Sequence, residues 1–437
     1  MKIKHFLYCI LSAPNIINLT IKAGILLFKK NKHHDAHEIL TISSGLEGGG
    51  AERIAFQILE TLKENKRLAL LGHNESKNER YVDTHTLKPK VSKWLKKLQA
   101  KTGLLDFFHI NPVFFLSDDR FGNIAIIHLH NIHADYFSPL SLIWLSKGRH
   151  LIWTLHDMFA FTGHCSHSLD CERWRSGCGS CPYLHAYPPV QRDLTAFLLR
   201  IKKMSYKNCN MTIVCPSHWI MEKARQSILK DKKFALIPNG VDVDIFYPQD
   251  KKSIRNKLGL PENGVFFLFV ANKGKSNPWK GGGFYEELAL SFTDTPNVYF
   301  ISIGNSEIKI ERNTISLPFV KDQKLLASYY NVADALVYPS LADTFPLTVI
   351  ESLACGVPVI AFATGGIPEI LRHEENGYLA SAGEVKELKS GVDWVLKNRH
   401  EKKLIEKTCR DTVLKEYTLT KMIERYHSLY RTMGWPY

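Results

Sequence analysis

From about residue 38 the chain alternates short apolar runs with segments whose apolar residues recur every three or four positions. The first apolar run, EILTISS at 38–44, precedes a glycine-rich stretch and then a segment with Ile54, Ile58 and Leu62 on one helical face. Strands that alternate with helices are typical of parallel sheets covered by helices. The pattern therefore predicts an α/β fold.

The apolar runs fall into two series. The first series predicts strands at 38–44, 67–72, 123–131, 150–157, 211–217 and 234–241. After a polar stretch around 249–263, the second series predicts strands at 265–272, 298–305, 335–340 and 358–364. We therefore expect two doubly wound, Rossmann-like domains that face each other across a cleft, with ligands at the carboxyl ends of their strands.

The restart of the pattern divides the chain into four expected segments: an extension (1–36), a first domain (37–245), a second domain (246–415) and a terminal helix rich in Tyr and Leu (416–437). The extension begins like a signal peptide, but its apolar run is short and no clear small-residue cleavage site follows. Polar residues and a proline interrupt it, so it makes a poor membrane span. A helix on a membrane surface and a helix packed on the first domain both stay open.

Composition and charge narrow the class of protein. Hydrophobic residues make up 45% and charged residues 23% of the 437 residues, which is ordinary for a globular protein with a sizeable core. The formal charge of +14 favours anionic partners such as phosphorylated small molecules, nucleic acid or an acidic membrane face. Nine cysteines without an export signal argue for a reducing compartment and against a disulfide framework.

The stretch ADTFPLTVIESLACG places two carboxylates, Asp343 and Glu351, around Pro346 in an otherwise apolar run. Proline suits the first turn of a helix, and the free amides of the 344–347 turn can face a phosphate or a sugar ring. Asp343 can then accept hydrogen bonds from ring hydroxyls and Glu351 from a ribose diol. Alternatively, Asp343 is a helix N-cap and Glu351 a partly solvated helix residue. On this stretch alone both interpretations stay open.

The same stretch continues with GVPV at 356–359 and GGIPE at 365–369, and the whole resembles the signature of retaining family 4 glycosyltransferases, which have the GT-B fold. The first acid of that signature is usually Glu, so Asp343 is a conservative departure. GGGAER at 48–53 resembles the family's glycine loop after the first strand, where glycines let backbone amides approach a diphosphate. IPNGVDVDIFYP at 237–248 resembles the family's segment between the two domains. Its D-x-D is a linker turn, not a metal motif.

The resemblance implies a donor site in the second domain and an acceptor site in the first. The implied donor-binding residues are Gly49, Gly50, Lys280, Asp343, Thr344, Phe345, Pro346, Leu347 and Glu351, and the implied catalytic residues are His156, Asp343 and Lys280. Lys280 would meet the donor diphosphate, and His156 would donate a hydrogen bond to the reacting sugar as a neutral imidazole. Lys273 and Lys275 are better explained as solvated lysines. His130 is a weaker candidate, because histidines at strand ends are often structural.

The implied reaction moves a sugar from a UDP- or GDP-linked donor to a saccharide or lipid-linked saccharide with retention of configuration. It implies bacterial surface-polysaccharide synthesis, at the inner face of the cytoplasmic membrane, with no cofactor for catalysis and no nucleic acid as partner. Two alternatives remain: a non-catalytic, basic membrane-binding protein that keeps the scaffold, and a nucleotide-sugar epimerase of the same fold.

Four cysteines, Cys165, Cys171, Cys178 and Cys181, cluster in GHCSHSLDCERWRSGCGSCPYL. A C-x-x-C pair is a common half-site for zinc, so the cluster predicts a structural zinc that fixes a long loop beside the cleft. Unligated cysteines are the alternative. The glycosyltransferases with a similar cluster resemble those of bacterial exopolysaccharide and colanic-acid assembly.

The segment 88–108, KPKVSKWLKKLQAKTGLLDFF, interleaves lysines with Trp94, Leu95, Leu98 and Leu105. Wound as a helix, it could present an apolar side to an anionic lipid surface, or pack on the core with a solvated lysine face. Because the family often meets lipid-linked acceptors in this region, the resemblance favours a membrane surface as partner.

Overall fold

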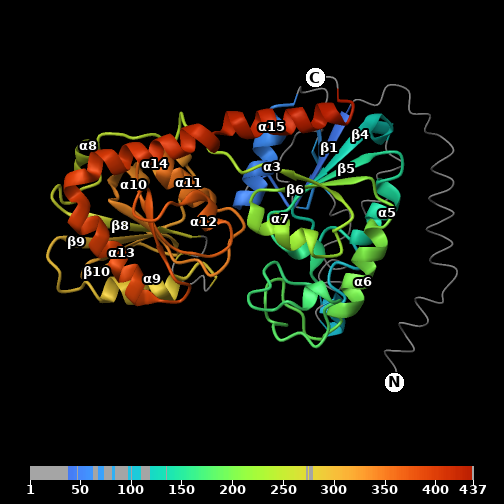
Figure 1. Cartoon of the computed structure of the whole chain (residues 1–437), viewed down its shortest axis with the longest axis horizontal. Helices are drawn as coiled ribbons and strands as arrows, with labels where there is room; N and C mark the ends of the chain where they lie inside the picture. The colour runs from blue at the N-terminus through green and yellow to red at the C-terminus, as the bar shows by residue number, and fades with distance from the viewer. Residues whose placement is uncertain are drawn as a thin grey trace.

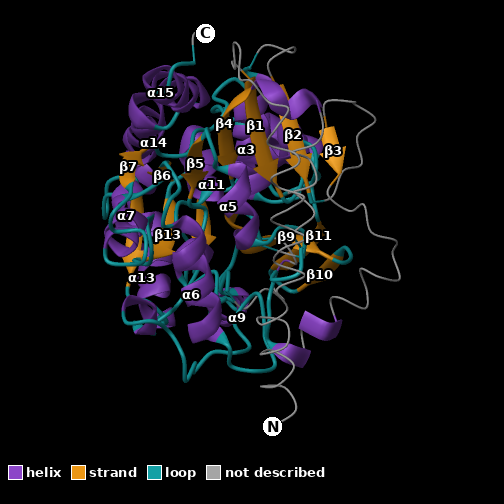
Figure 2. Cartoon of the chain, turned by 90° about the vertical axis from the view of Figure 1, so that its right-hand side faces the viewer, coloured by secondary structure: helices purple, strands orange, loops and turns teal. Residues whose placement is uncertain are grey.

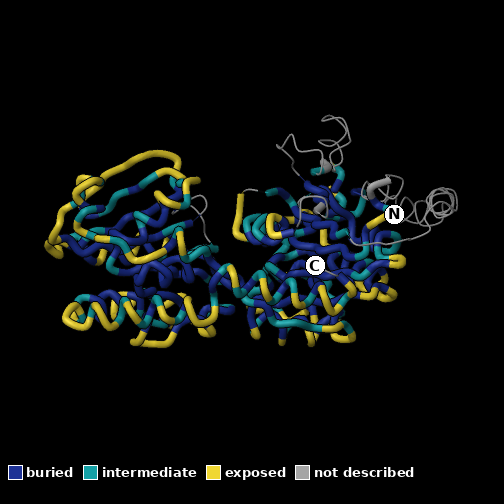
Figure 3. Tube along the Cα trace, turned by 90° about the horizontal axis from the view of Figure 1, so that it is seen from above, coloured by how far each residue is buried: buried dark blue, intermediate teal, exposed yellow. Residues whose placement is uncertain are grey.

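A computed structural model gives the structure of the chain (Figure 1). It describes residues 38–46, 48–62, 67–72, 81–83, 97–99, 101–109, 119–133, 135–271, 274 and 279–435. The described part forms two lobes side by side, each built around one sheet with helices on its faces (Figures 1 and 3). The two-domain α/β architecture predicted from the sequence is therefore confirmed.

The first lobe holds a seven-stranded sheet in the order β3-β2-β1-β4-β5-β6-β7. Its strands are β1 (Glu38–Ser43), β2 (Arg67–Leu71), β3 (Tyr81–Asp83), β4 (Ile124–Leu129), β5 (His150–Thr154), β6 (Met211–Cys215) and β7 (Lys233–Leu236). Every neighbouring pair is parallel. The order reverses direction between β1 and β4, which makes the carboxyl ends of these two strands the expected ligand site.

The second lobe repeats this plan in the order β10-β11-β9-β8-β12-β13-β14. Its strands are β8 (Val265–Val270), β9 (Val298–Asn305), β10 (Lys309–Glu311), β11 (Thr314–Pro318), β12 (Ala335–Tyr338), β13 (Val359–Phe362) and β14 (Gly377–Ala380). β10 pairs antiparallel with β11, and the other pairs are parallel. The reversal lies between β8 and β12.

Helices cover both sheets (Figure 2). Those of the first lobe are α3 (Gly50–Glu60), α5 (Leu142–Leu145), α6 (Thr195–Tyr206) and α7 (His218–Arg225). Those that follow are α8 (Lys251–Lys257), α9 (Gly282–Leu290), α10 (Gln323–Val332), α11 (Leu347–Ala354), α12 (Ile367–Ile370), α13 (Val385–Lys397), α14 (Lys402–Glu416) and α15 (Leu419–Thr432).

All ten strands predicted from apolar runs are present in the structure. The central ones are buried on both faces, as parallel strands between helices must be, so they appear in the sequence as continuous apolar runs. The strands β3, β10, β11 and β14 were not predicted. They are short and lie at or near the sheet edges, and β10 is fully exposed, so burial imposes no apolar pattern on them.

The last helix, α15, returns from the second lobe and lies along the first (Figure 1). Two of its tyrosines reach the first sheet: the hydroxyl of Tyr426 is 2.9 Å from Thr154 Oγ1, and that of Tyr430 is 2.8 Å from His128 Nδ1. A parallel bridge between Val241 and Thr418 adds a backbone connection. The C-terminal helix therefore fastens the two lobes together.

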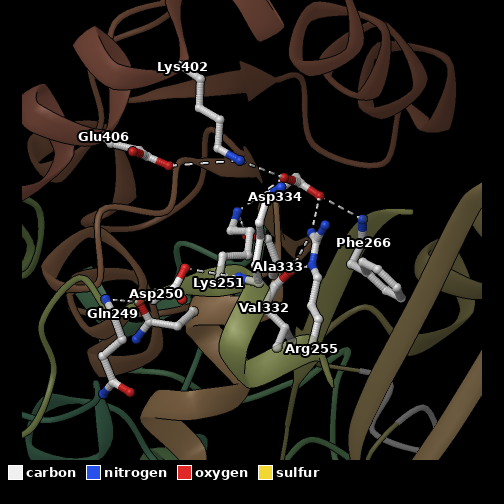
Figure 4. A network of polar contacts seen from close by, with 12 residues as sticks. Gln249, Asp250, Lys251, Arg255, Phe266, Val332, Ala333, Asp334, Lys402 and Glu406 are labelled. Carbon is white, nitrogen blue, oxygen red and sulfur yellow. Dashed lines mark hydrogen bonds and ion pairs between the residues drawn. The ribbon is translucent and has the colours of Figure 1, made fainter. Parts of the chain in front are cut away.

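Asp334, directly before β12, gathers a network of charges in the second lobe (Figure 4). Its carboxylate accepts from Arg255 at 2.8 Å, from Lys251 at 3.1 Å and from the backbone amide of Phe266 at 2.9 Å, and Lys402 lies 3.3 Å away. Burial alone would raise the pKa of Asp334, but the three cations lower it well below the ordinary value. The negative charge of Asp334 therefore holds α8 and the start of α14 to the sheet.

We predict that Asp334→Asn lowers the free energy of unfolding by about 3 kcal/mol at pH 7, because it leaves buried cations without their carboxylate. Since the native pKa is depressed, this contribution exists above the ordinary pKa near 3.8 and is lost as the pH falls through and below that value. Urea denaturation measures it. The control is Glu311→Gln, which breaks the exposed pair with Lys309 and should change little. Equal unfolding midpoints for the two variants would contradict the prediction.

Candidate functional site

The candidate site lies at the carboxyl ends of β1 and β4 in the first lobe and of β8 and β12 in the second. The loop after β12 contains Asp343, and the residue that meets it is Lys280, just before α9. Their side chains form an ion pair. The ammonium of Lys280 also donates to the hydroxyl of Tyr338 at 2.8 Å, and that hydroxyl donates to Asp343 at 2.6 Å. The structure therefore brings together two of the three predicted catalytic residues.

The protonation states of this triad are fixed by its charges. Burial would raise the pKa of Asp343, but the charge of Lys280 and the hydrogen bonds from Lys280 and Tyr338 lower it. Burial would lower the pKa of Lys280, but Asp343 and Tyr338 raise it above the ordinary value. At neutral pH the site therefore holds one ammonium and one carboxylate, and Lys280 is a permanent cation.

Two glycine turns hold the loop after β12 in place. Gly281 has φ +76°, and a Cβ there would lie 1.8 Å from the carbonyl oxygen of Pro339. Gly365 has φ +59°, and a Cβ there would lie 1.7 Å from the carbonyl oxygen of Asp343. No other residue fits at either position, because the conformation is left-handed and the backbones touch. These glycines therefore set the distance between Lys280 and Asp343.

Glu351 lies in the second turn of α11 and is 1% exposed. One carboxylate oxygen forms an ion pair with Arg53, from the helix α3 of the other lobe, and the other accepts from the hydroxyl of Tyr330 at 2.8 Å. The alternative of a partly solvated Glu351 is therefore wrong. Asp343 is not the N-cap of α11 either: Pro346 occupies that position, and Asp343 Oδ1 accepts from the amide of Phe345 at 3.1 Å.

The glycine loop of the first lobe faces the start of α11. Gly49 is the N-cap of α3, and a Cβ on Gly50 would lie 3.3 Å from the side chain of Leu347. The predicted donor-binding residues of both lobes therefore meet at one place. Arg53, three residues after Gly50, lies at the same place. Its role could not be predicted, because a single arginine at the start of a helix matches no motif.

Backbone contacts across the lobes fix the remaining donor-loop residues. The carbonyl of Thr344 accepts from Ser217 at 2.9 Å, and that of Phe345 accepts from Asn239 at 3.2 Å. The carboxylate of Glu369 accepts the amides of His218 and Trp219 at 2.8 and 2.7 Å, at the start of α7. A carboxylate at a helix N-terminus is stabilised by the free amides and the helix dipole. The side chains of Ser217 and Asn239 therefore hold the backbone of the 343–347 turn in place.

The first lobe contributes a row of histidines. His156 Nε2 lies 2.9 Å from His130 Nδ1, and the two rings stack with centroids 5.2 Å apart. Burial lowers the pKa of His156 to about 4. Burial and the neighbouring His128 and His156 lower the pKa of His130 well below its ordinary value. Both imidazoles are therefore neutral at pH 7, as predicted for a histidine that donates to a sugar hydroxyl. His130 contacts His156 directly, and whether either imidazole meets a sugar stays a prediction.

A buried ion pair lies beside these histidines. His133 Nε2 is 2.8 Å from Asp157, whose other oxygen accepts the amide of Phe159 at 2.8 Å. Burial would lower the pKa of His133, but the Asp157 charge and hydrogen bond raise it above the ordinary value. Burial would raise the pKa of Asp157, but His133 lowers it to about 2. These residues line a small cavity together with His130 and His156. Sequence reasoning missed the pair, since its members are distant in the chain.

The cysteine loop presents half-buried free thiols at Cys165, Cys171, Cys178 and Cys181. Burial raises the pKa of Cys165 to about 12 and that of Cys178 to about 11, and their neighbouring thiols add to the effect. In the described part of the chain these cysteines form no group whose ligand atoms all lie within 4.8 Å, as a loaded zinc site would require. The predicted structural zinc therefore stays a prediction.

Several predicted features lie outside the described residues. These are the extension 1–36, residues 88–96 and 100 of the basic segment 88–108, which include Trp94 and Leu95, and the lysines Lys273 and Lys275. Among the helices that the structure describes, none is both long and apolar enough to span a bilayer.

Comparison with protein families identifies both lobes. Residues 48–245 match the family described as Glycosyltransferase Family 4, and residues 295–411 match the family described as Glycosyl transferases group 1. The two matches fall on the two sheets separately.

Individual relatives agree with these matches. The chain is 26% identical over 374 residues to an Escherichia coli K12 protein described as a colanic acid biosynthesis glycosyl transferase, WcaC, and covers 89% of it with 80% of its own length. Among solved structures, sucrose-phosphate synthase from Thermosynechococcus elongatus aligns over 91% of this chain and 99% of its own, with a TM-score of 0.63 at 18% identity. Anabaena HepE, in complex with UDP-glucose, aligns over 90% of this chain and 99% of its own, with a TM-score of 0.62 at 15% identity. These solved structures confirm the fold.

We predict that His133 titrates above its ordinary pKa of 6.5, because Asp157 stabilises its charged form, whereas His156 titrates near 4. NMR titration of the imidazole Cε1 protons between about pH 2.5 and 9 measures both, with His133→Gln and His156→Gln used for assignment. A His156 resonance that shifts with a midpoint near 6.5 would contradict the described burial of this imidazole.

Proposed function

The chain belongs to the group 1 family of glycosyl transferases, and from that membership we propose that it moves a sugar from a nucleoside diphosphate to a saccharide or lipid-linked saccharide. We further propose that the transfer retains the anomeric configuration. One observation carries the assignment of the site: Lys280, Asp343 and the glycine loop before α3 meet at the start of α11.

The charge distribution suits the departure of a nucleoside diphosphate. As the bond to the anomeric carbon breaks, positive charge develops on the sugar and negative charge on the phosphate. Lys280 is a fixed cation, and the amides at the starts of α3 and α11 are free donors that can stabilise the leaving group. Asp343, beside Lys280, lies where it can accept hydrogen bonds from the sugar hydroxyls. The lysine would therefore contribute mainly to the transition state.

Glu351 is proposed to bind the ribose. In the structure its two oxygens accept from Arg53 and Tyr330, and a carboxylate that accepts two hydrogen bonds can also accept from a vicinal diol. Arg53 would then move aside when the nucleotide enters, while Tyr330 keeps its hydrogen bond. In this exchange the Glu351 carboxylate, which is 1% exposed, is paired with Arg53 when no nucleotide sugar is bound and with the ribose when one is bound.

The first lobe is proposed to orient the reacting sugar and the acceptor. His156 is neutral and half-buried, so it can donate to a sugar hydroxyl without placing a second positive charge beside the developing cation. The acceptor would attack on the face that the diphosphate leaves, with the leaving phosphate taking its proton. Such a step needs no carboxylate nucleophile and no metal ion.

The relatives favour a substrate class. WcaC is described as an enzyme of colanic acid biosynthesis, and HepE was solved with UDP and UDP-glucose. We therefore propose a uridine-linked sugar as donor and a growing surface polysaccharide as acceptor. The excess of 57 Lys and Arg over 43 Asp and Glu supports an acceptor at the anionic inner face of the cytoplasmic membrane. A structural zinc in the cysteine loop would fix the loop without taking part in the transfer.

A screen of nucleotide sugars with a membrane extract as acceptor tests this function. We predict transfer from at least one UDP-sugar, and a kcat/KM for Lys280→Ala about 10²- to 10³-fold lower, because one donor to the leaving group is lost. Lys324→Ala, an exposed lysine of α10, is the matched control and should keep full activity. Folded protein that turns over no nucleotide sugar would contradict the proposal.

Glu351 gives a separate prediction for binding. Glu351→Ala should weaken the binding of UDP by roughly tenfold to a hundredfold, since two hydrogen bonds from the ribose to a charged acceptor are lost. Isothermal titration calorimetry measures the affinity, and Glu311→Ala in the exposed strand β10 is the control. Unchanged affinity in a folded Glu351→Ala variant would remove Glu351 from the donor site.

A further inference from the structure

We propose that Asp106, His109 and Asp135 form a second, structural site that binds one divalent cation, of the kind that favours carboxylate and imidazole ligands. One ligand atom from each of the three residues lies within 4.8 Å of the other two. This site is separate from the sugar-transfer chemistry and from the cysteine loop. The proposal does not depend on the function proposed above.

The cluster is buried. Asp106 is fully inaccessible, His109 is 3% exposed and Asp135 is half-buried. Burying a carboxylate as completely as Asp106 is costly unless a positive charge accompanies it. The two cationic groups that act on Asp106 are engaged elsewhere: Lys202 donates to the carbonyls of Phe159 and Thr162, and His133 pairs with Asp157.

Two buried oxygens at or beside the cluster have no hydrogen-bond donor among the residues that the structure describes. One is Oδ2 of Asp106, whose other oxygen accepts the amide of Asp135 at 2.8 Å. The second is Oε1 of Gln99, a side chain that is 2% exposed. The nitrogen of the Gln99 amide lies 2.9 Å from Asp135 Oδ1 and 3.2 Å from His109 Nε2, so this side chain belongs to the same cluster. Buried acceptors in a folded protein are nearly always satisfied, and a cation bound by the cluster would satisfy Asp106.

The ligand types indicate the class of cation. Two carboxylates and one imidazole form a hard set without sulfur, which suits Mn²⁺ or another divalent first-row ion better than it suits a thiolate-selective ion. The cysteine loop, in contrast, offers four thiols and the imidazole of His164, whose Nε2 lies 3.5 Å from Cys181 Sγ, and would prefer Zn²⁺. The two sites can therefore be distinguished by the metal that each retains.

The position of the cluster gives the cation a structural role. It would join the segment 101–109 to the loop 135–138, which are already connected by a bond from the amide of Ser138 to the carbonyl of His109 at 2.8 Å. His133, two residues before Asp135, lines the cavity of the candidate acceptor side. A cation here would therefore stabilise the loop that positions the His133–Asp157 pair.

The test uses the full chain, stripped with EDTA and titrated with Mn²⁺ under reducing conditions. The loss of the free Mn²⁺ electron paramagnetic resonance signal counts the bound ion, and the thermal midpoint reports its effect on stability. We expect one Mn²⁺ per chain, a rise in the midpoint, and at least tenfold weaker binding in Asp135→Asn. Asp106→Asn gives the same test at the buried ligand.

The control is the double variant Cys178→Ser/Cys181→Ser, which should bind Mn²⁺ as the wild type does. Because Asp135 is half-buried, we expect Asp135→Asn to fold, and circular dichroism checks this. Failure of the folded wild type to bind Mn²⁺, Co²⁺ or Zn²⁺ outside the cysteine loop would overturn the proposal. Equal binding by the wild type and by Asp135→Asn would also overturn it.

Discussion

The ion pair between Lys280 and Asp343 is the constraint on which the candidate site depends. Both groups are partly buried, and each shifts the pKa of the other in the direction that favours its charged form. The pair spans the carboxyl ends of β8 and β12, where the order of the second sheet reverses. Gly281 and Gly365 bring the backbones close enough for the two side chains to meet. The strand order, the two glycine turns and the ion pair therefore all lie at the same end of the second sheet.

A second constraint connects this point to the first lobe. Glu351 is neutralised by Arg53, and the 343–347 turn is held by Ser217 and Asn239. The polar groups proposed to bind the donor are therefore already paired within the protein. An entering nucleotide would exchange one set of hydrogen bonds for another, without leaving a buried charge unpaired at any stage. Such an exchange costs less than the exposure of a preformed but unsatisfied site.

The sequence predicted what periodicity and motif spacing encode. Doubly buried strands such as β8 and β12 appear as apolar runs, and the resemblance of the stretch around Pro346 to a family signature predicted a donor loop there. Edge strands such as β10 could not be predicted, because an exposed strand does not need apolar residues. A second group of residues could not be predicted for a different reason: Arg53, Tyr330 and the His133–Asp157 pair. Their roles arise from contacts between separate segments, which neither spacing nor residue type reveals. The return of α15 to the first lobe belongs to the same class.

The most direct measurement is a crystal structure of the chain with a non-hydrolysable uridine diphosphate sugar. The account predicts the diphosphate within hydrogen-bonding distance of Lys280 Nζ, with the ribose hydroxyls on Glu351 in place of Arg53. A nucleotide bound elsewhere, with the Lys280–Asp343 and Arg53–Glu351 pairs left untouched, would contradict it.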